Sequence, residues 1–283
     1  MNMNVLNRSS RTEGLVDKTK NLFSRLTGRN GRSRRRRGDR VRRALTRAGT
    51  GLATTAALVA GYRYAFQPWH QTWGATTAEA EKPLPGDGLV PNPSYETTRA
   101  VTIEAPTEAV WPWLVQMGQG RGGFYSYDWL ENLFGLDIHN TDHIVSEWQD
   151  LEPGDEVWLA PPTDYDGQAK MRVIHLEPRR SLVFGPAVDT AQDFEAASQT
   201  GAGTWAFVLE PIDDQTTRLI VRTRSRPWQA PRGVFYLYDP AHFLMERRMM
   251  LGIKGRAESS VQARGESPTE EREHAHEPAE TDL

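Results

Sequence analysis

The chain has 283 residues, with 34 Lys and Arg against 37 Asp and Glu, and it contains no cysteine. The lack of cysteine excludes disulfides, thiolate metal sites and cysteine nucleophiles. Charge is divided along the chain, because residues 1–47 carry 15 Lys and Arg against 3 Asp and Glu, whereas the remainder carries a net charge of −15. The length allows two domains, but a single folded domain accounts for the informative part.

Residues 1–47 form a basic arm whose densest part runs from Arg32 to Arg37. So polar a segment cannot bury enough apolar surface to fold by itself, and we predict that it is disordered. An arginine-rich arm can contact nucleic acid, bind anionic lipid headgroups or flank a membrane span. No DNA- or RNA-binding motif accompanies it, which argues against a nucleic-acid partner.

Residues 48–69 favour a transmembrane helix as the reason for the basic arm. Ala48 to Tyr62 carries no charge, and Arg63 can extend the run if its side chain reaches the membrane interface. Interfacial aromatic residues would follow at Tyr62, Tyr64, Phe66 and Trp69. The positive-inside rule would then keep the N-terminus cytoplasmic in a membrane-anchored protein. The alternative is a buried or surface helix leading into a soluble, cytoplasmic domain.

Two further segments are predicted to lie outside the folded domain. Residues 70–96 are interpreted as a linker, because four prolines and two glycines fall between Pro83 and Pro93. Residues 259–283 are polar and mostly acidic, which predicts a disordered tail. The folded domain is therefore expected over residues 97–258.

The domain begins with a strand over 98–104, and later segments also alternate with the period of strands. Trp205, Phe207 and Leu209 alternate with smaller residues, and Leu219 and Val221 alternate with arginines. The pattern predicts an antiparallel meander with these strands: 155–160, 169–176, 181–185, 204–210 and 216–224. The interval from Pro186 to Gly203 is expected to be an acidic, mobile loop.

Helices are predicted on either side of the meander. One begins after Pro106 and carries an apolar stripe through Val110, Trp113, Leu114 and Met117, and a short second helix follows over 127–134. The last helix is expected over 241–256, with Asp239-Pro240 as its capping residue and first turn.

Residues 110–134 combine aromatic side chains with a few polar groups, which is the usual composition of a small-molecule site. Together with two strand positions they supply the predicted ligand-binding residues, although core packing can explain each aromatic. These residues are Trp113, Met117, Arg121, Phe124, Tyr125, Trp129, Trp205 and Phe207.

General acid–base chemistry is a second possibility for the same region. Its candidate residues are Tyr127, Asp128, Glu131 and His139. Two histidines and two aspartates between Asp137 and His143 could ligate a metal, but no third distant ligand stands out. We interpret them as a polar loop, and predict neither a metal nor a cofactor.

The order of one strand, two short helices, antiparallel strands and a long C-terminal helix resembles the helix-grip fold of the START/Bet v 1-like (SRPBCC) superfamily. That fold expects six strands after the helices, and Ile144–Trp148 could supply the one that is missing. The chain looks like an uncharacterised bacterial and archaeal branch through these motifs: Trp73–Thr76, Leu84–Asp87, Val110–Gly118, Gly122–Asn132, Trp148–Leu151 and Met245–Lys254.

The resemblance implies an α+β domain in which a curved sheet wraps around the C-terminal helix and encloses an apolar cavity. It therefore favours a carrier or sensor of a hydrophobic small molecule or lipid, tethered to the membrane. The alternatives are an aromatase/cyclase or dehydratase-type enzyme on a polyketide-like or isoprenoid substrate, and a membrane-associated interaction module without a ligand. Fold alone does not decide among them.

Overall fold

The computed structural model describes residues 46, 50–51, 53–133, 135–188, 190–199, 202–226 and 232–274. The predicted basic arm, apart from Thr46, and residues 275–283 of the predicted tail lie outside the described residues. The chain divides into two compact units, residues 1–66 and 67–283. Within the first unit the described residues from Ala53 onward are helical and end in a π-helix, η1 (Tyr62–Phe66).

In the part of the chain that the structure describes, no helix combines the length and apolarity needed to cross a membrane. The described residues therefore give no support to the transmembrane helix that was expected over residues 48–69. Alanine, glycine and threonine make up most of residues 48–61, and their side chains add little hydrophobicity. The charge of Arg63 then falls inside η1.

The described part of the second unit contains a six-stranded sheet in the order β1-β6-β5-β4-β3-β2, with every neighbouring pair antiparallel. The strands are β1 (Tyr95–Ile103), β2 (Glu156–Trp158), β3 (Lys170–Glu177), β4 (Ser181–Pro186), β5 (Gly203–Asp213) and β6 (Thr216–Ser225). The predicted meander is therefore present. Residues 146–148, where a further strand was expected, form the 3-10 helix η3 (Ser146–Trp148) instead.

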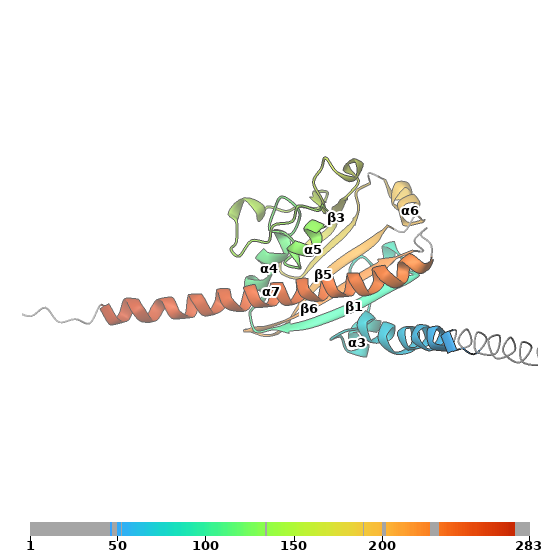
Figure 1. Cartoon of the computed structure of the whole chain (residues 1–283). Coiled ribbons are helices and arrows are strands. Elements are labelled where there is room, and N and C mark those ends of the chain that lie inside the picture. Colours follow the sequence, from blue (N-terminus) through green and yellow to red (C-terminus); the bar gives the residue numbers. More distant parts are fainter. Residues whose placement is uncertain are drawn as a thin grey trace, which may run out of the picture. The chain divides into compact units, whose positions relative to one another are not determined.

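Alternation along the strands places apolar side chains on both faces of the sheet. Phe207, Leu209 and Leu219 belong to the main core, together with α4 (Thr107–Val115) and α7 (Arg232–His274). Figure 1 shows α7 lying along the sheet, which fits the helix-grip arrangement. Gly252 on α7 allows close approach, because a Cβ there would lie 2.3 Å from the Tyr125 carbonyl oxygen.

The outer face of the sheet is covered by the segment that was predicted to be a linker. It contains α3 (Thr77–Glu81) and η2 (Asp87–Leu89), and the end of α2 (Gln67–Gln71) overlaps its first two residues. Leu84 packs against Ala100, Val208 and Ile220 on the outer face. Ala100, Val208 and Ile220 are buried under this segment, so an uncovered outer face would expose these apolar side chains to water.

Arginines on β6 fix this covering segment to the sheet. The Arg222 guanidinium is almost fully buried and donates to Asp87 Oδ2 at 2.6 Å, to Thr98 Oγ1 at 2.9 Å and to backbone carbonyls of residues 79, 80 and 82. Arg218 pairs with Glu79 at 2.7 Å and lowers the pKa of that carboxyl to about 2. Residues 70–96 are thus part of the domain, which corrects the linker prediction.

Three other boundaries differ from those predicted. The interval expected to be a mobile loop contains α6 (Ala191–Gln199). The last helix begins at Arg232, so Asp239 and Pro240 lie inside α7 and Asp239 is not its capping residue. It also continues to His274, through residues that were predicted to be a disordered tail. The short second helix, α5 (Asp128–Leu133), agrees with its prediction to within about a residue.

Candidate ligand cavity

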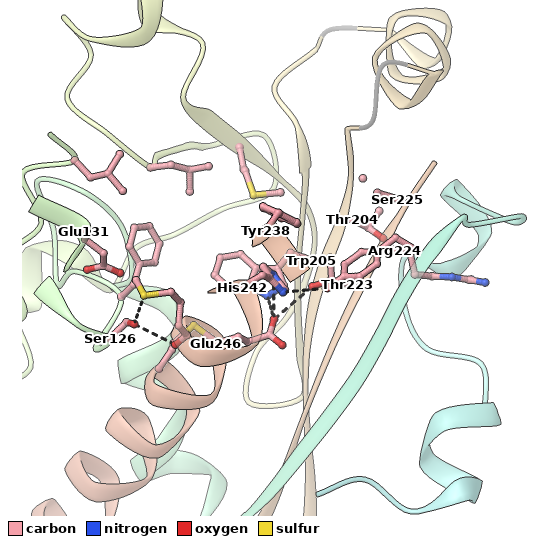
Figure 2. Close-up of a pocket in the computed structure, with 18 residues that line it drawn as sticks. Ser126, Glu131, Thr204, Trp205, Thr223, Arg224, Ser225, Tyr238, His242 and Glu246 are labelled. Carbon is pink, nitrogen blue, oxygen red and sulfur yellow. Dashed lines mark hydrogen bonds and ion pairs between the residues drawn. The ribbon is translucent and has the colours of Figure 1, made fainter. Parts of the chain in front are cut away.

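A cavity of about 350 Å³ lies between α7, the sheet and the segment around α5. Its lining residues come from all of these elements, and Figure 2 shows them. The apolar part of the lining consists of Phe124, Leu136, Leu159, Met171, Trp205, Met245 and Met249. The polar part includes Tyr95, Ser126, Glu131, Thr204, Thr223, Tyr238, His242 and Glu246.

Three of the polar lining residues lie on one face of α7. Tyr238, His242 and Glu246 are spaced at four residues, so they lie on the same face of the helix. The rings of Tyr238 and His242 stack with centroids 5.6 Å apart. Asp239, the residue after Tyr238, does not belong to the cavity lining and is fully buried.

Glu246 is the centre of a hydrogen-bonded group. It forms a buried, short ion pair with Arg99 on β1. Its Oε1 accepts a hydrogen bond from Trp205 Nε1 at 3.0 Å and one from Thr223 Oγ1 at 3.4 Å. A buried carboxylate needs such partners, because losing water without compensation is strongly unfavourable.

A second buried carboxylate, Asp239, lies behind the cavity wall. Tyr95 Oη donates to its Oδ1 at 2.9 Å, and Gln67 Nε2 donates to its Oδ2 at 3.3 Å. His70 Nε2 lies 3.2 Å from the same oxygen. Burial, followed by the negative charge of Asp239, raises the pKa of Tyr95, so the phenol stays protonated. These contacts tie α2 and β1 to α7.

Glu131 enters the cavity from α5 and is held differently. It is 5% exposed, and its Oε2 has no hydrogen-bond partner among the described residues. Burial, and next the negative charge of Asp128, raise the pKa of Glu131 from its ordinary value of 4.5 to about 7. The cavity therefore holds one carboxylate in an ion pair and one carboxyl group that can be protonated near neutral pH.

The other predicted acid–base residues do not join Glu131 in the cavity. Asp128 is exposed, Tyr127 is partly exposed and neither belongs to the lining. The His139 side chain is 80% exposed and lies 3.1 Å from Asp137, which is also exposed. The predicted cluster is thus not assembled. No group of metal-binding side chains occurs within the described ranges.

The predicted ligand-binding residues are distributed over four environments. Phe124 and Trp205 line the cavity, with ring centroids 6.3 Å apart. Arg121 donates to the carbonyls of residues 115 and 148, and Trp129 is 66% exposed. The remaining four fill the core: Trp113, Met117, Tyr125 and Phe207.

Sequence reasoning did not select the polar residues of α7. The four-residue spacing of Tyr238, His242 and Glu246 was a readable signal, since it places titratable groups on one helix face. The Asp239-Pro240 pair obscured it, because such a pair usually marks a helix start. Tyr95 and Arg99 carry no local signal, and only the pairing of β1 with the rest of the sheet brings them here.

A strand, two helices, an antiparallel sheet and a long C-terminal helix beside a cavity define the helix-grip fold. The chain has this α+β fold, which is that of START/Bet v 1-like and polyketide cyclase-type proteins, as the sequence predicted.

Comparison with solved structures gives matches of low sequence identity. A protein from Nitrosomonas europaea is 14% identical, with 63% of this chain and 99% of that one covered and a TM-score of 0.34. The Aha1 dimer from Colwellia psychrerythraea is 14% identical, with 58% and 96% covered and a TM-score of 0.31. The di-domain ARO/CYC protein BexL of the BE-7585A biosynthetic pathway is 14% identical, with 58% and 46% covered and a TM-score of 0.34.

No protein-family model matches the chain, and no curated protein does. The structural similarities concern the fold alone, and function has to be argued from the cavity.

Proposed function

We propose that the protein binds a hydrophobic small molecule in the cavity beside α7. The observation that carries the proposal is the cavity itself, about 350 Å³ in volume, walled by aromatic, leucine and methionine side chains with a few convergent polar groups. Ligand pockets usually measure about 300–1,000 Å³ and have this composition. Burial of apolar ligand surface against Phe124, Trp205 and Met171 would supply most of the affinity.

The volume limits the ligand's size. At the lower end of the usual range, the cavity suits a compact ring system or a short isoprenoid better than a whole phospholipid. A lipid would have to leave much of its chain outside.

Native mass spectrometry of the full chain, purified without detergent, tests this proposal directly. A reproducible bound molecule, or saturable uptake of the neutral fluorophore N-phenylnaphthylamine, is the expected result. Leu159→Trp, which fills the cavity, should weaken uptake, whereas Ile212→Trp at an exposed position should not. Absence of both a bound molecule and any fluorophore uptake would contradict the proposal.

A specific observation favours a second function, an enzyme of the aromatase/cyclase or dehydratase type. Glu131 presents an unpartnered carboxyl oxygen to an apolar cavity, with a pKa of about 7. A group of that pKa can both remove and return a proton near neutral pH. On a β-hydroxy ketone it would take the proton beside the carbonyl and return it to the departing hydroxyl, which leaves as water.

The aldol adduct of benzaldehyde and acetone is a simple probe for this second function. Its dehydration to the conjugated ketone is followed by ultraviolet absorbance. Catalysis by the wild type that Glu131→Gln abolishes, while N-phenylnaphthylamine uptake persists, would support an enzyme. Equal rates for the two proteins would leave binding as the function.

A further inference from the structure

The hydrogen bonds around His242 determine which of its ring nitrogens carries the proton. Arg99 Nη1 lies 3.3 Å from His242 Nδ1. A guanidinium has donors and no acceptor, so Arg99 donates and Nδ1 accepts. A neutral imidazole that accepts at Nδ1 carries its hydrogen on Nε2.

The surroundings of His242 hold this tautomer in place. Arg99 cannot turn away, because its Nε donates to the His70 carbonyl at 2.8 Å and its Nη1 is ion-paired with Glu246. The Tyr95 hydroxyl, 3.4 Å from Nδ1, directs its hydrogen to Asp239. Burial lowers the pKa of His242, as do the charges of Arg99 and His70, whereas Glu246 and Asp239 act in the opposite direction.

The Nε2 hydrogen of His242 has no acceptor of its own within hydrogen-bond distance in the described ranges. The nearest charged oxygen, Glu246 Oε1, lies 3.9 Å away and already accepts from Trp205 and Thr223. The His242 side chain lines the cavity and is 19% exposed. Figure 2 shows it on α7 between Glu246 and Tyr238. A ligand in the cavity can therefore supply the missing acceptor.

The charges at the cavity surface exclude one class of acceptor. Glu131 and Glu246 both line the cavity. Arg224 is the one lysine or arginine in the described lining, but its guanidinium is engaged with Asp87 and Glu96 and points away from the cavity (Figure 2). An anionic ligand would meet two carboxyl groups and no inward-facing cation, so its desolvation would not be compensated.

We infer that the ligand is an uncharged apolar molecule with a carbonyl-type oxygen, and that this oxygen accepts a hydrogen bond from His242 Nε2. The inference rests on the proposed binding function and specifies its ligand class. It excludes free fatty acids and other carboxylates as preferred ligands, and it distinguishes ketones and esters from plain hydrocarbons. A buried donor that stays unpaired beside a hydrocarbon weakens binding, which is the source of the selectivity.

Three probes of nearly identical shape test the ligand class: acetylnaphthalene, isopropenylnaphthalene and naphthoate. They differ in presenting a carbonyl, a methylene or a carboxylate at the same place. For the full wild-type chain we expect acetylnaphthalene to bind about tenfold more tightly than isopropenylnaphthalene. Naphthoate should bind most weakly. Competition with N-phenylnaphthylamine gives the three affinities.

Two substitutions assign the preference to His242. His242→Phe keeps a ring but removes the donor, so acetylnaphthalene and isopropenylnaphthalene should bind equally. His242→Gln keeps an N–H group and should retain part of the preference; it also serves if the phenylalanine variant does not fold. The carbonyl stretching frequency of bound acetylnaphthalene should be lower in the wild type than in His242→Phe, which loss of packing alone would not produce.

Nitrogen-15 NMR of the wild type provides an independent test of the tautomer. The expected spectrum has the His242 hydrogen on Nε2, with that signal moving when acetylnaphthalene binds. Equal affinity for the ketone and the hydrocarbon, tighter binding of naphthoate, or a hydrogen on Nδ1 would each overturn the inference while leaving the cavity a binding site. If N-phenylnaphthylamine binds but none of the three probes displaces it, the inference fails and the binding function stands. If the fluorophore does not bind and no bound molecule is found, the proposed function fails, and the inference fails with it.

Discussion

Replacing Glu131 by glutamine should remove a pH-dependent loss of stability. The folded protein raises the pKa of this carboxyl from 4.5 to about 7, so the folded state binds the proton more tightly than the unfolded state. The stabilisation that comes from protonated Glu131 is complete below pH about 4.5 and is lost as the pH rises through about 7. Glutamine resembles the protonated form in shape and cannot ionise.

The size of the effect follows from the two pKa values. At about 1.4 kcal/mol per pH unit, the change corresponds to about 3 kcal/mol. Glu131 is buried but borders the cavity, where solvent screens the charge, so we expect about 1–3 kcal/mol. Burial is the larger cause and Asp128 the smaller, so Asp128→Asn should move the midpoint slightly toward lower pH.

Urea unfolding followed by tryptophan fluorescence, repeated between pH about 4 and about 8.5, measures this effect. The free energies of unfolding of the wild type and Glu131→Gln should be similar at the acidic end, and the variant should be more stable at the alkaline end. Glu147→Gln, an exposed glutamate, is the matched control. A difference between variant and wild type that does not change with pH would refute the reasoning, because it would show that Glu131 titrates alike in both states.

Three further predictions concern the frame around the cavity. Arg222→Met should lower the free energy of unfolding by about 3–5 kcal/mol in urea titrations, because it leaves buried acceptors of the covering segment unpaired. Gly252→Ala should lower the free energy of unfolding in urea titrations by about 1–3 kcal/mol, because its Cβ would meet the Tyr125 carbonyl oxygen. Gly255→Ala, with open space around it, should be neutral or stabilising in the same titrations. Because Glu79 has its pKa lowered to about 2, its contribution is present above pH about 4.5 and lost as the pH falls through about 2. Glu79→Gln should therefore cost about 1–2 kcal/mol near neutral pH, after allowance for screening, and nothing below pH about 2.

The sheet could be predicted from the sequence because strand periodicity is a local property. Phe207 and Leu209 alternate with Val208, and the structure places the first two in the main core and the third on the outer face. The strand predicted over 216–224 is observed as Thr216–Ser225. In each case neighbouring residues contain the whole signal.

The covering segment was missed because its partners are distant in the sequence. Prolines and glycines between Pro83 and Pro93 exclude long helices and strands, but they say nothing about whether the segment packs. Its attachment depends on Asp87 and Glu79, whose arginine partners lie on β6, more than a hundred residues away. Apolar residues on both faces of β5 and β6 were the one available hint that the sheet is covered twice.

The candidate site was predicted only in part for a similar reason. Aromatic residues in one stretch can point into the core or into a cavity. Trp113 lies in the core, whereas Phe124 lines the cavity. The sequence placed the acid–base candidates on one stretch as well, yet only Glu131 reaches the cavity. Other polar lining residues, Tyr238, His242 and Glu246, come from α7. They were not predicted because Asp239 and Pro240 resemble a helix start, so Tyr238, which precedes them, was not recognised as part of the same helix.

The two cavity carboxyl groups show how one fold can give the same side chain different chemistry. Glu246 is enclosed by donors from three strands, Arg99, Trp205 and Thr223, so its charge is matched where it stands. Glu131 has a bare oxygen against apolar surface, so the cavity favours its neutral form. If a ketone oxygen of the ligand accepts the hydrogen bond from His242, Glu131 is the second polar group that can distinguish between ligands. In its neutral form it can donate a hydrogen bond to a second oxygen of the ligand. A ligand with two separated oxygens should therefore bind more tightly below pH about 7 than above it, and a ligand with only the ketone should not.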